Sequence, residues 1–169
     1  MTTPTPGRSA PDPTRRVWPV PGRGPGRLGR VLLVADDPLS PSRLAAVLRR
    51  AGFFVLVAQS GRHALREICM RGFELVITDV VVQDLDGLEL LRWLRRLHGG
   101  IPAIALSGAG PDAGALYAKA AQCIGADVTL PKPAEPASVL AAAHRLTARP
   151  GPGRSWGAPA PADAPVSAT

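Results

Sequence analysis

The strongest restriction on the fold is an alternation, between residues 30 and 147, of short apolar runs with longer stretches of helical period. The runs are nearly continuous in apolar residues, as expected of strands covered on both faces. This alternation is typical of βα units that build a parallel sheet. We therefore predict one α/β domain, a doubly wound sheet of five parallel strands with five helices. The predicted strands are residues 31–35, 53–57, 75–78, 103–106 and 128–130.

The stretches between these runs carry apolar residues three and four positions apart, which is the spacing of one helix face. Three of them are strongly striped. The fourth, at about residues 112–124, is rich in alanine and weakly striped, and the fifth runs from about Pro136 to Leu146. Four glycines follow helices at positions where a left-handed residue commonly ends the helix: Gly52, Gly72, Gly99 and Gly125.

Composition separates this core from the two ends of the chain. Of the 18 Gly and 19 Pro residues, 12 fall in residues 1–29 and 8 in residues 148–169. Segments of this composition bury too little apolar surface to offset the entropy of ordering. A length of 169 residues is also typical of one domain. We therefore expect a domain at residues 30–147 between two disordered tails.

The charge of +7 is uneven, because residues 1–29 carry +4 and the longer core only +2. Five Arg spread over that segment, with Trp18 as the only aromatic, make a sparse patch, so nucleic-acid binding through the tails stays an alternative only. No apolar run approaches the length of about 20 residues that a membrane span requires. We expect a cytoplasmic protein without membrane insertion. Cys69 and Cys123 lack metal-type spacing, so neither a disulfide nor a metal role is expected.

Polar residues stand at the ends of four of the five predicted strands. In an open parallel sheet, these carboxyl ends meet where ligands bind. Three carboxylates drawn together repel one another unless a hard divalent cation, of which Mg²⁺ fits best, lies among them. One carboxylate can then attack phosphorus, while a hydroxyl and an ammonium stabilise the phosphoryl oxygens. The residues are Asp36 and Asp37, then Asp79 as our choice of nucleophile, then Ser107 and Lys132.

Lysine usage adds to this hypothesis. Of the 20 basic residues, only Lys119 and Lys132 are lysines. Because the chain uses Arg wherever a generic positive charge suffices, Lys132 suggests a need for a compact point charge beside a phosphoryl oxygen. Chance retention of a lysine is the alternative interpretation.

The order and placement of these motifs resemble the receiver domain of the two-component response regulator family, with its CheY-like, flavodoxin-like fold. The resemblance covers residues 30–147 and implies signal transduction by phosphorelay. A histidine kinase or a phosphotransfer protein would then donate the phosphoryl group, and an unknown downstream protein would respond. The motifs that carry the resemblance are residues 31–37, 75–79, 84–91, 105–108, 125–127 and 131–133.

The resemblance also implies individual roles for the site residues. Asp79 would be the phosphoacceptor, Ser107 the switch hydroxyl that moves toward the phosphoryl group, and Lys132 its cationic partner, next to a cis bond to Pro133. Asp84 and Asp86 are better interpreted as loop and helix-start residues. The implied Mg²⁺ ligands are Asp37 directly, Asp36 directly or through water, Asp79, and the backbone carbonyl of Val81.

One departure from the family concerns the output of the signal. Thr129 lies three residues before Lys132, where the family often has a Tyr or Phe whose burial reports phosphorylation. With no ring there, we expect the glycine-rich stretch 108–116 to respond instead.

Three function classes remain to be compared. Residues 148–169 contain no helix-turn-helix pattern, so we expect a stand-alone module that binds other proteins. An enzyme of the aspartate-nucleophile phosphatase type would need an acid at Val81, so we expect no enzyme. The open alternative is a degenerate receiver that binds protein or nucleic acid without phosphorylation.

Overall fold

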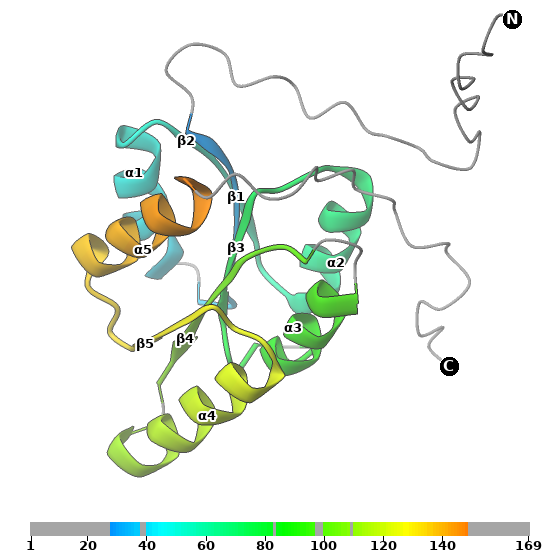
Figure 1. The fold of residues 1–169 in the computed structure, drawn as a ribbon, viewed down its shortest axis with the longest axis vertical. Helices are drawn as coiled ribbons and strands as arrows, with labels where there is room; N and C mark the ends of the chain where they lie inside the picture. Colours follow the sequence, from blue (N-terminus) through cyan, green and yellow to red (C-terminus); the bar gives the residue numbers. More distant parts are fainter. Residues whose placement is uncertain (1–27, 38–39, 83, 97–99, 109, 149–169) are drawn as a thin grey trace, which may run out of the picture.

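The computed structural model describes residues 28–37, 40–82, 84–96, 100–108 and 110–148, in which strands and helices alternate (Figure 1). The strands are Gly29–Val34 (β1), Phe53–Ala58 (β2), Leu75–Asp79 (β3), Ala103–Ser107 (β4) and Val128–Pro131 (β5). The helices are Ser40–Arg50 (α1), Gly61–Met70 (α2), Gly87–Arg96 (α3), Gly110–Ile124 (α4) and Pro136–Ala148 (α5).

The five strands form one parallel sheet in the order β2-β1-β3-β4-β5, which confirms the predicted fold. The direction of winding reverses between β1 and β3, because the chain first moves outward to β2 and then crosses back. The register aligns Asp79 with Leu106 and Ser107 with Pro131. The polar residues that end these strands are therefore brought to the same edge of the sheet.

Helices cover both faces of the sheet, which explains why the strands are apolar runs. In β1, Val31 and Leu33 belong to the core shared with α1 and α5, whereas Leu32 and Val34 belong to the core shared with α2, α3 and α4. The two helix layers lie on opposite sides of the sheet in Figure 1. Alternate side chains of one strand are thus buried in different cores, as expected of a doubly wound fold.

Helix α4 begins earlier than the sequence pattern predicts. It starts at Gly110, with Pro111 in its first turn, where the missing proline N–H costs no helical hydrogen bond. Much of the glycine-rich stretch 108–116 is therefore helix rather than loop. Helix α5 likewise extends past the predicted end, to Ala148.

The glycine predictions are partly right. Gly52 and Gly125 follow α1 and α4 with φ of 99° and 131°, in the left-handed region as expected. Gly72 is not left-handed, because the chain already leaves α2 at Arg71 in an extended conformation (φ −139°, ψ 145°). Gly99 and most of both predicted tails lie outside the described residues. The ends of those tails nearest the domain are described, and there Gly29 begins β1 and Ala148 ends α5.

Two further observations concern the sequence-based expectations. Within the described ranges, no helix combines the length and the apolar character needed to cross a membrane. Cys69 in α2 and Cys123 in α4 are free thiols, the first partly buried and the second exposed.

Candidate functional site

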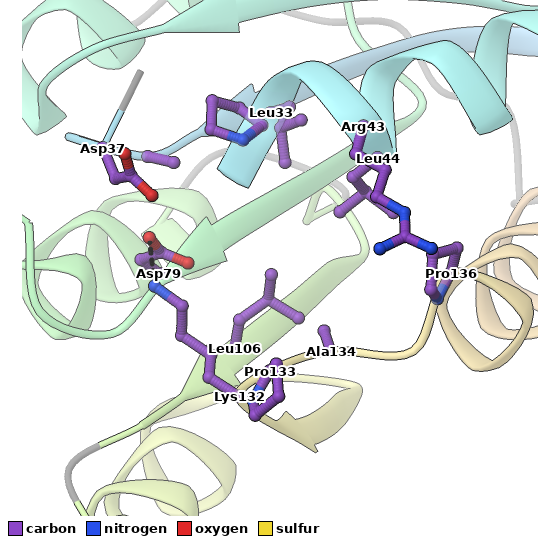
Figure 2. A pocket seen from close by; sticks show the side chains of 12 residues that line it. Leu33, Asp37, Arg43, Leu44, Asp79, Leu106, Lys132, Pro133, Ala134 and Pro136 are labelled. Carbon is purple, nitrogen blue, oxygen red and sulfur yellow. Dashed lines mark hydrogen bonds and ion pairs between the residues drawn. The ribbon is translucent and has the colours of Figure 1, made fainter. Parts of the chain in front are cut away.

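A cavity of about 350 Å³ opens at the carboxyl edge of the sheet, between α1 and the segment that joins β5 to α5. Asp37, Asp79 and Lys132 lie at one end of it, and Arg43 lies at the other (Figure 2). Asp37 and Asp79 point toward each other, whereas the Arg43 guanidinium points away, toward Pro136. The rest of the lining is mostly apolar: Leu33, Ala35, Pro41, Leu44, Leu106, Pro133, Ala134 and Pro136.

Asp79 is fixed by the centre of the sheet. It ends β3, whose five residues are all buried, and its side chain is only 3% exposed. The Thr78 hydroxyl donates to the Asp79 carbonyl at 2.9 Å, and the Val80 N–H donates to the Leu106 carbonyl at 2.9 Å. Strand pairing thus continues past Asp79 and holds its backbone on both sides.

Lys132 faces this carboxylate from the edge strand. Its ammonium Nζ lies 2.8 Å from Asp79 Oδ2, while its side chain remains 32% exposed. Its backbone N–H donates to the Ser107 carbonyl at 2.8 Å, which ties the residue to the end of β4. The bond from Lys132 to Pro133 is cis, as the resemblance implied.

The electrostatics of Asp79 are unusual for an aspartate. Burial raises the pKa of its carboxyl, and the nearby Asp36 and Asp37 carboxylates raise it further. The hydrogen bond and the charge of Lys132 lower the same pKa, but the net shift is upward. The charged form of the Asp79 carboxyl is therefore disfavoured, mainly by burial and further by the two neighbouring carboxylates.

A divalent cation would offset the repulsion among these carboxylates. Asp36 and Asp37 follow β1 with exposed side chains, and in the described ranges no group of three or more acidic, His or Cys side chains is arranged so that it could hold a metal ion. Mg²⁺ does not need three such side chains, since it keeps several waters and binds through one or two carboxylates. Asp37 and Asp79, which point toward each other at one end of the cavity, fit this requirement, and Asp36 lies near enough to affect the Asp79 carboxyl.

The remaining predicted residues lie around this centre but not in the cavity lining. Ser107 ends β4 and is buried at 5% exposure, on the strand next to Asp79. Val81 follows β3 by two residues, with a side chain that is 57% exposed. Asp86 directly precedes α3, and its carboxylate accepts from the Leu88 N–H at 3.1 Å, in agreement with its predicted role at the helix start.

Two glycines belong to the site that sequence reasoning did not single out. Gly87 donates its N–H to the Val80 carbonyl at 3.0 Å, and a methyl group on it would collide with the Asp79 carbonyl oxygen. Gly108 lies directly against the side chain of Lys132. The signal for Gly87 was available, since glycine directly after an acidic helix cap suggests a close backbone approach.

Comparison with known proteins agrees with this geometry. Residues 31–144 match the family model of the response regulator receiver domain. The chain belongs to this family. It is 39% identical over 104 residues to the transcriptional activator protein PfeR of Pseudomonas aeruginosa, a stretch that covers 62% of this chain and 33% of PfeR.

Two solved receiver structures are similar over most of their length. The receiver domain of a signal transduction histidine kinase from Syntrophus aciditrophicus is 28% identical, with a TM-score of 0.63 over 71% of this chain and 90% of that chain. A CheY-like receiver domain protein from Methanospirillum hungatei has the same fold, with 24% identity and a TM-score of 0.62 over 70% and 93% of the two chains. In contrast, this receiver chain spans only 18% to 41% of the length of the first curated regulators that it matches.

Proposed function

We propose that this receiver domain accepts a phosphoryl group on Asp79 and passes the signal on by binding another protein. The observation that carries the proposal is the buried Asp79 carboxylate, paired with Lys132 at 2.8 Å at the reversal point of the sheet. A carboxylate held in this way is oriented for nucleophilic attack from within the cavity.

The proposal includes Mg²⁺, held by Asp37 and Asp79 with assistance from Asp36 and the backbone carbonyl of Val81. When bound, the cation would neutralise charge on the phosphoryl oxygens and on the acidic cluster. The raised pKa of Asp79 agrees with this part of the proposal, because a bound cation would favour the charged carboxylate that burial and the neighbouring carboxylates disfavour.

The chain's own residues then have distinct tasks. A carboxylate oxygen of Asp79 forms a bond to phosphorus while the bond between phosphorus and the donor's leaving atom breaks, and the leaving group departs with its electron pair. The Lys132 ammonium pairs with a phosphoryl oxygen, and the Ser107 hydroxyl donates a hydrogen bond to another. The protein is thus an acceptor and not an enzyme acting on a separate substrate.

Family membership supports a histidine kinase or a phosphotransfer protein as the donor. Because such donors work in the cytoplasm, the proposal places the protein there too. The target of the signal would be a downstream protein. The alternative of binding through basic tails concerns residues outside the described ranges, and the nearly neutral core adds nothing in its favour.

Acetyl phosphate provides a direct test. We expect the full chain to gain one acid-stable, base-labile phosphoryl group in the presence of Mg²⁺ and none in the presence of EDTA, as measured by intact mass. Peptide mass spectrometry should locate the group on Asp79. Modification of another residue, or none under either condition, would contradict the proposal and favour a receiver that acts without phosphorylation.

A further inference from the structure

Strand β2 forms an open edge of the sheet. Among the described strands it pairs with β1 alone, and its six residues, Phe53–Ala58, include no charged side chain. Edge strands present a row of unpaired N–H and C=O groups, which proteins often blunt with proline or lysine. The opposite edge has both, because β5 ends at Pro131 and Lys132 follows it. Of the two edges, β2 is therefore the one that can accept another strand.

The outward-facing backbone groups of β2 follow from its pairing with β1. The Ala58 carbonyl accepts a hydrogen bond from the Ala35 N–H at 3.1 Å, so it points toward β1. Successive residues of a strand point their backbone groups in opposite directions, so those of the odd-numbered residues face away from the sheet. In agreement, Nη2 of Arg49 reaches the Val55 carbonyl from α1 and donates to it at 2.9 Å. A guanidinium thus lies on the open edge, near its centre.

Arg49 uses little of its binding capacity in this position. Its side chain is exposed, and in the part of the chain that the structure describes no carboxylate is paired with it. A guanidinium has five N–H donors in a fork that fits a carboxylate with two parallel bonds, whereas the Val55 carbonyl takes one. A strand that approaches β2 can therefore donate its own N–H to that carbonyl and offer a carboxylate to the released guanidinium.

The charge around β2 favours an acidic occupant. Residues 40–66, which form α1, β2 and most of α2, contain five exposed Arg and no Asp or Glu. Because α1 and α2 lie on opposite faces of the sheet (Figure 1), positive charge flanks the edge strand on both sides. The next acidic residue, Glu67, is already paired with Arg71 at 2.8 Å. A second copy of this chain would bring its own Arg49 to the same place, so like charges disfavour it.

An exposed aromatic ring lies on the other face of the same edge. Phe54 is 42% exposed, and the Arg30 guanidinium lies 5.5 Å from its ring centre. Phe54 is on the α2 side of the sheet, whereas Arg49 comes from α1 on the opposite side. Neighbouring strands bring facing side chains to about 4.5–5.5 Å between Cβ atoms, so an apolar residue of an added strand would cover this ring. The occupant should therefore alternate acidic and apolar residues.

We propose that the outer edge of β2 binds an acidic extended segment of another protein, which adds to the sheet as a further strand. The acidic side chains of that segment face α1 and pair with Arg49, and the apolar side chains that alternate with them cover Phe54. Backbone hydrogen bonds provide the affinity, and the alternation provides the specificity. Strand β1 separates this surface from Asp79, and the inference is independent of phosphoryl transfer.

Random peptides displayed on phage, selected on the immobilised full chain, supply the probe. We expect the selected peptides to alternate acidic and apolar residues. Their synthetic forms should bind Arg49→Gln about 10-fold more weakly than the natural chain, because hydrogen bonds between charged groups are the strongest. The matched control, Arg50→Gln, removes the same charge one residue away and should change affinity by less than about 2-fold. Selection of no acidic peptide, or equal losses in both variants, overturns the inference.

Amide hydrogen exchange shows whether the selected peptide pairs with β2 as a strand. The outward N–H groups of Phe53, Val55 and Val57 should gain protection when the peptide binds. Those of Phe54 and Leu56 face β1 and should be protected with or without it. Protection on α4 or α5 instead, or protection that does not alternate along β2, would contradict strand addition.

A proline variant separates the other occupants. Val55→Pro removes an outward N–H where an edge strand tolerates proline, so it should prevent peptide binding while the chain still unfolds cooperatively. If this variant does not fold, the comparison of Arg49→Gln with Arg50→Gln decides alone. Dimerisation of the natural chain that Val55→Pro or Arg49→Gln alters, seen by analytical ultracentrifugation, would make a second copy the occupant and overturn the inference. Binding of a short single-stranded DNA through Arg49, without protection of the outward N–H groups, would overturn it too.

Discussion

The two charged partners of the site belong to very different strands. Asp79 ends β3, which lies at the centre of the sheet and is buried throughout, whereas Lys132 follows β5, an edge strand that is only half-buried. Their side chains are 3% and 32% exposed. The carboxylate is therefore fixed by the core, while the lysine depends on a few contacts at the sheet edge. Loss of apolar side chains around β3 should therefore lower stability more than the same loss around β5.

The largest effect is expected from replacing the central carboxylate itself. Asp79→Asn should abolish labelling by acetyl phosphate, because an amide cannot form the acyl phosphate. The measurement is intact mass after incubation with Mg²⁺. The control is Asp84→Asn, which removes the charge of an exposed carboxylate. Asparagine tolerates the backbone φ of 70° at this position. Labelling of Asp79→Asn at the natural rate would refute Asp79 as the acceptor.

The difference between the strands should also appear in the free energy of unfolding. Ile77 in β3 is fully buried, so Ile77→Ala should cost about 3 to 4 kcal/mol through lost burial and the remaining cavity. Leu130 in β5 is only partly buried, so Leu130→Ala should cost about 1 kcal/mol. Urea denaturation of both variants measures the difference. Equal losses would show that β5 is as much part of the core as β3.

The burial of the Asp79 charge predicts a gain in stability when that charge is removed. Burial of the Asp79 carboxylate raises its pKa, so its charged form destabilises the fold at neutral pH. In Mg²⁺-free buffer, Asp79→Asn should therefore raise the unfolding free energy, since the exposed part of the Lys132 side chain can still be solvated.

Addition of Mg²⁺ should reduce this difference. At a concentration ten times its dissociation constant, the cation should stabilise the natural chain by about 1.4 kcal/mol and Asp79→Asn by much less. Thermal unfolding at several Mg²⁺ concentrations measures both changes. Equal stabilisation of the two chains would show that Mg²⁺ binds elsewhere.

The smallest effect is expected at the outer side of β5. The Gln122 amide of α4 donates to the Thr129 hydroxyl at 3.0 Å, in an exposed position. Such a hydrogen bond contributes about 0.5 kcal/mol. A double-mutant cycle with Gln122→Ala and Thr129→Val should give a coupling of this size. If phosphorylation changes the position of α4, the coupling energy between Gln122 and Thr129 should differ between the phosphorylated and unphosphorylated chains. An unchanged coupling energy would show that this contact does not transmit the signal.

The sequence predicted the fold and the meeting of Asp79 with Lys132 for a physical reason. The period of the apolar pattern determines which segments form strands and which form helices. The carboxyl ends of parallel strands then lie at one edge of the sheet, independently of the conformation of the loops. The start of α4 was less predictable, because glycine and proline in its first turn are compatible with both loop and helix.

Close contacts were beyond prediction from one sequence. The contact of Gly108 with the Lys132 side chain depends on how nearly the ends of β4 and β5 approach, which the pattern does not encode. The same holds for the contact made by Thr129. The sequence shows that this residue has no aromatic ring, but its hydrogen bond to Gln122 depends on the rotation of α4 about its own axis. The Mg²⁺ ligands and the output of the signal stay predictions.

The strand order also bears on how the protein is made. Strands β1 to β4 occupy adjacent places in the sheet, so they can pair while β5 is still on the ribosome. A nascent chain that ends within α4 already has the central strand that carries Asp79, together with an uncovered β4 edge. Lys132 arrives only with the last strand. An unfinished chain therefore carries the acceptor carboxylate without the lysine that acts beside it.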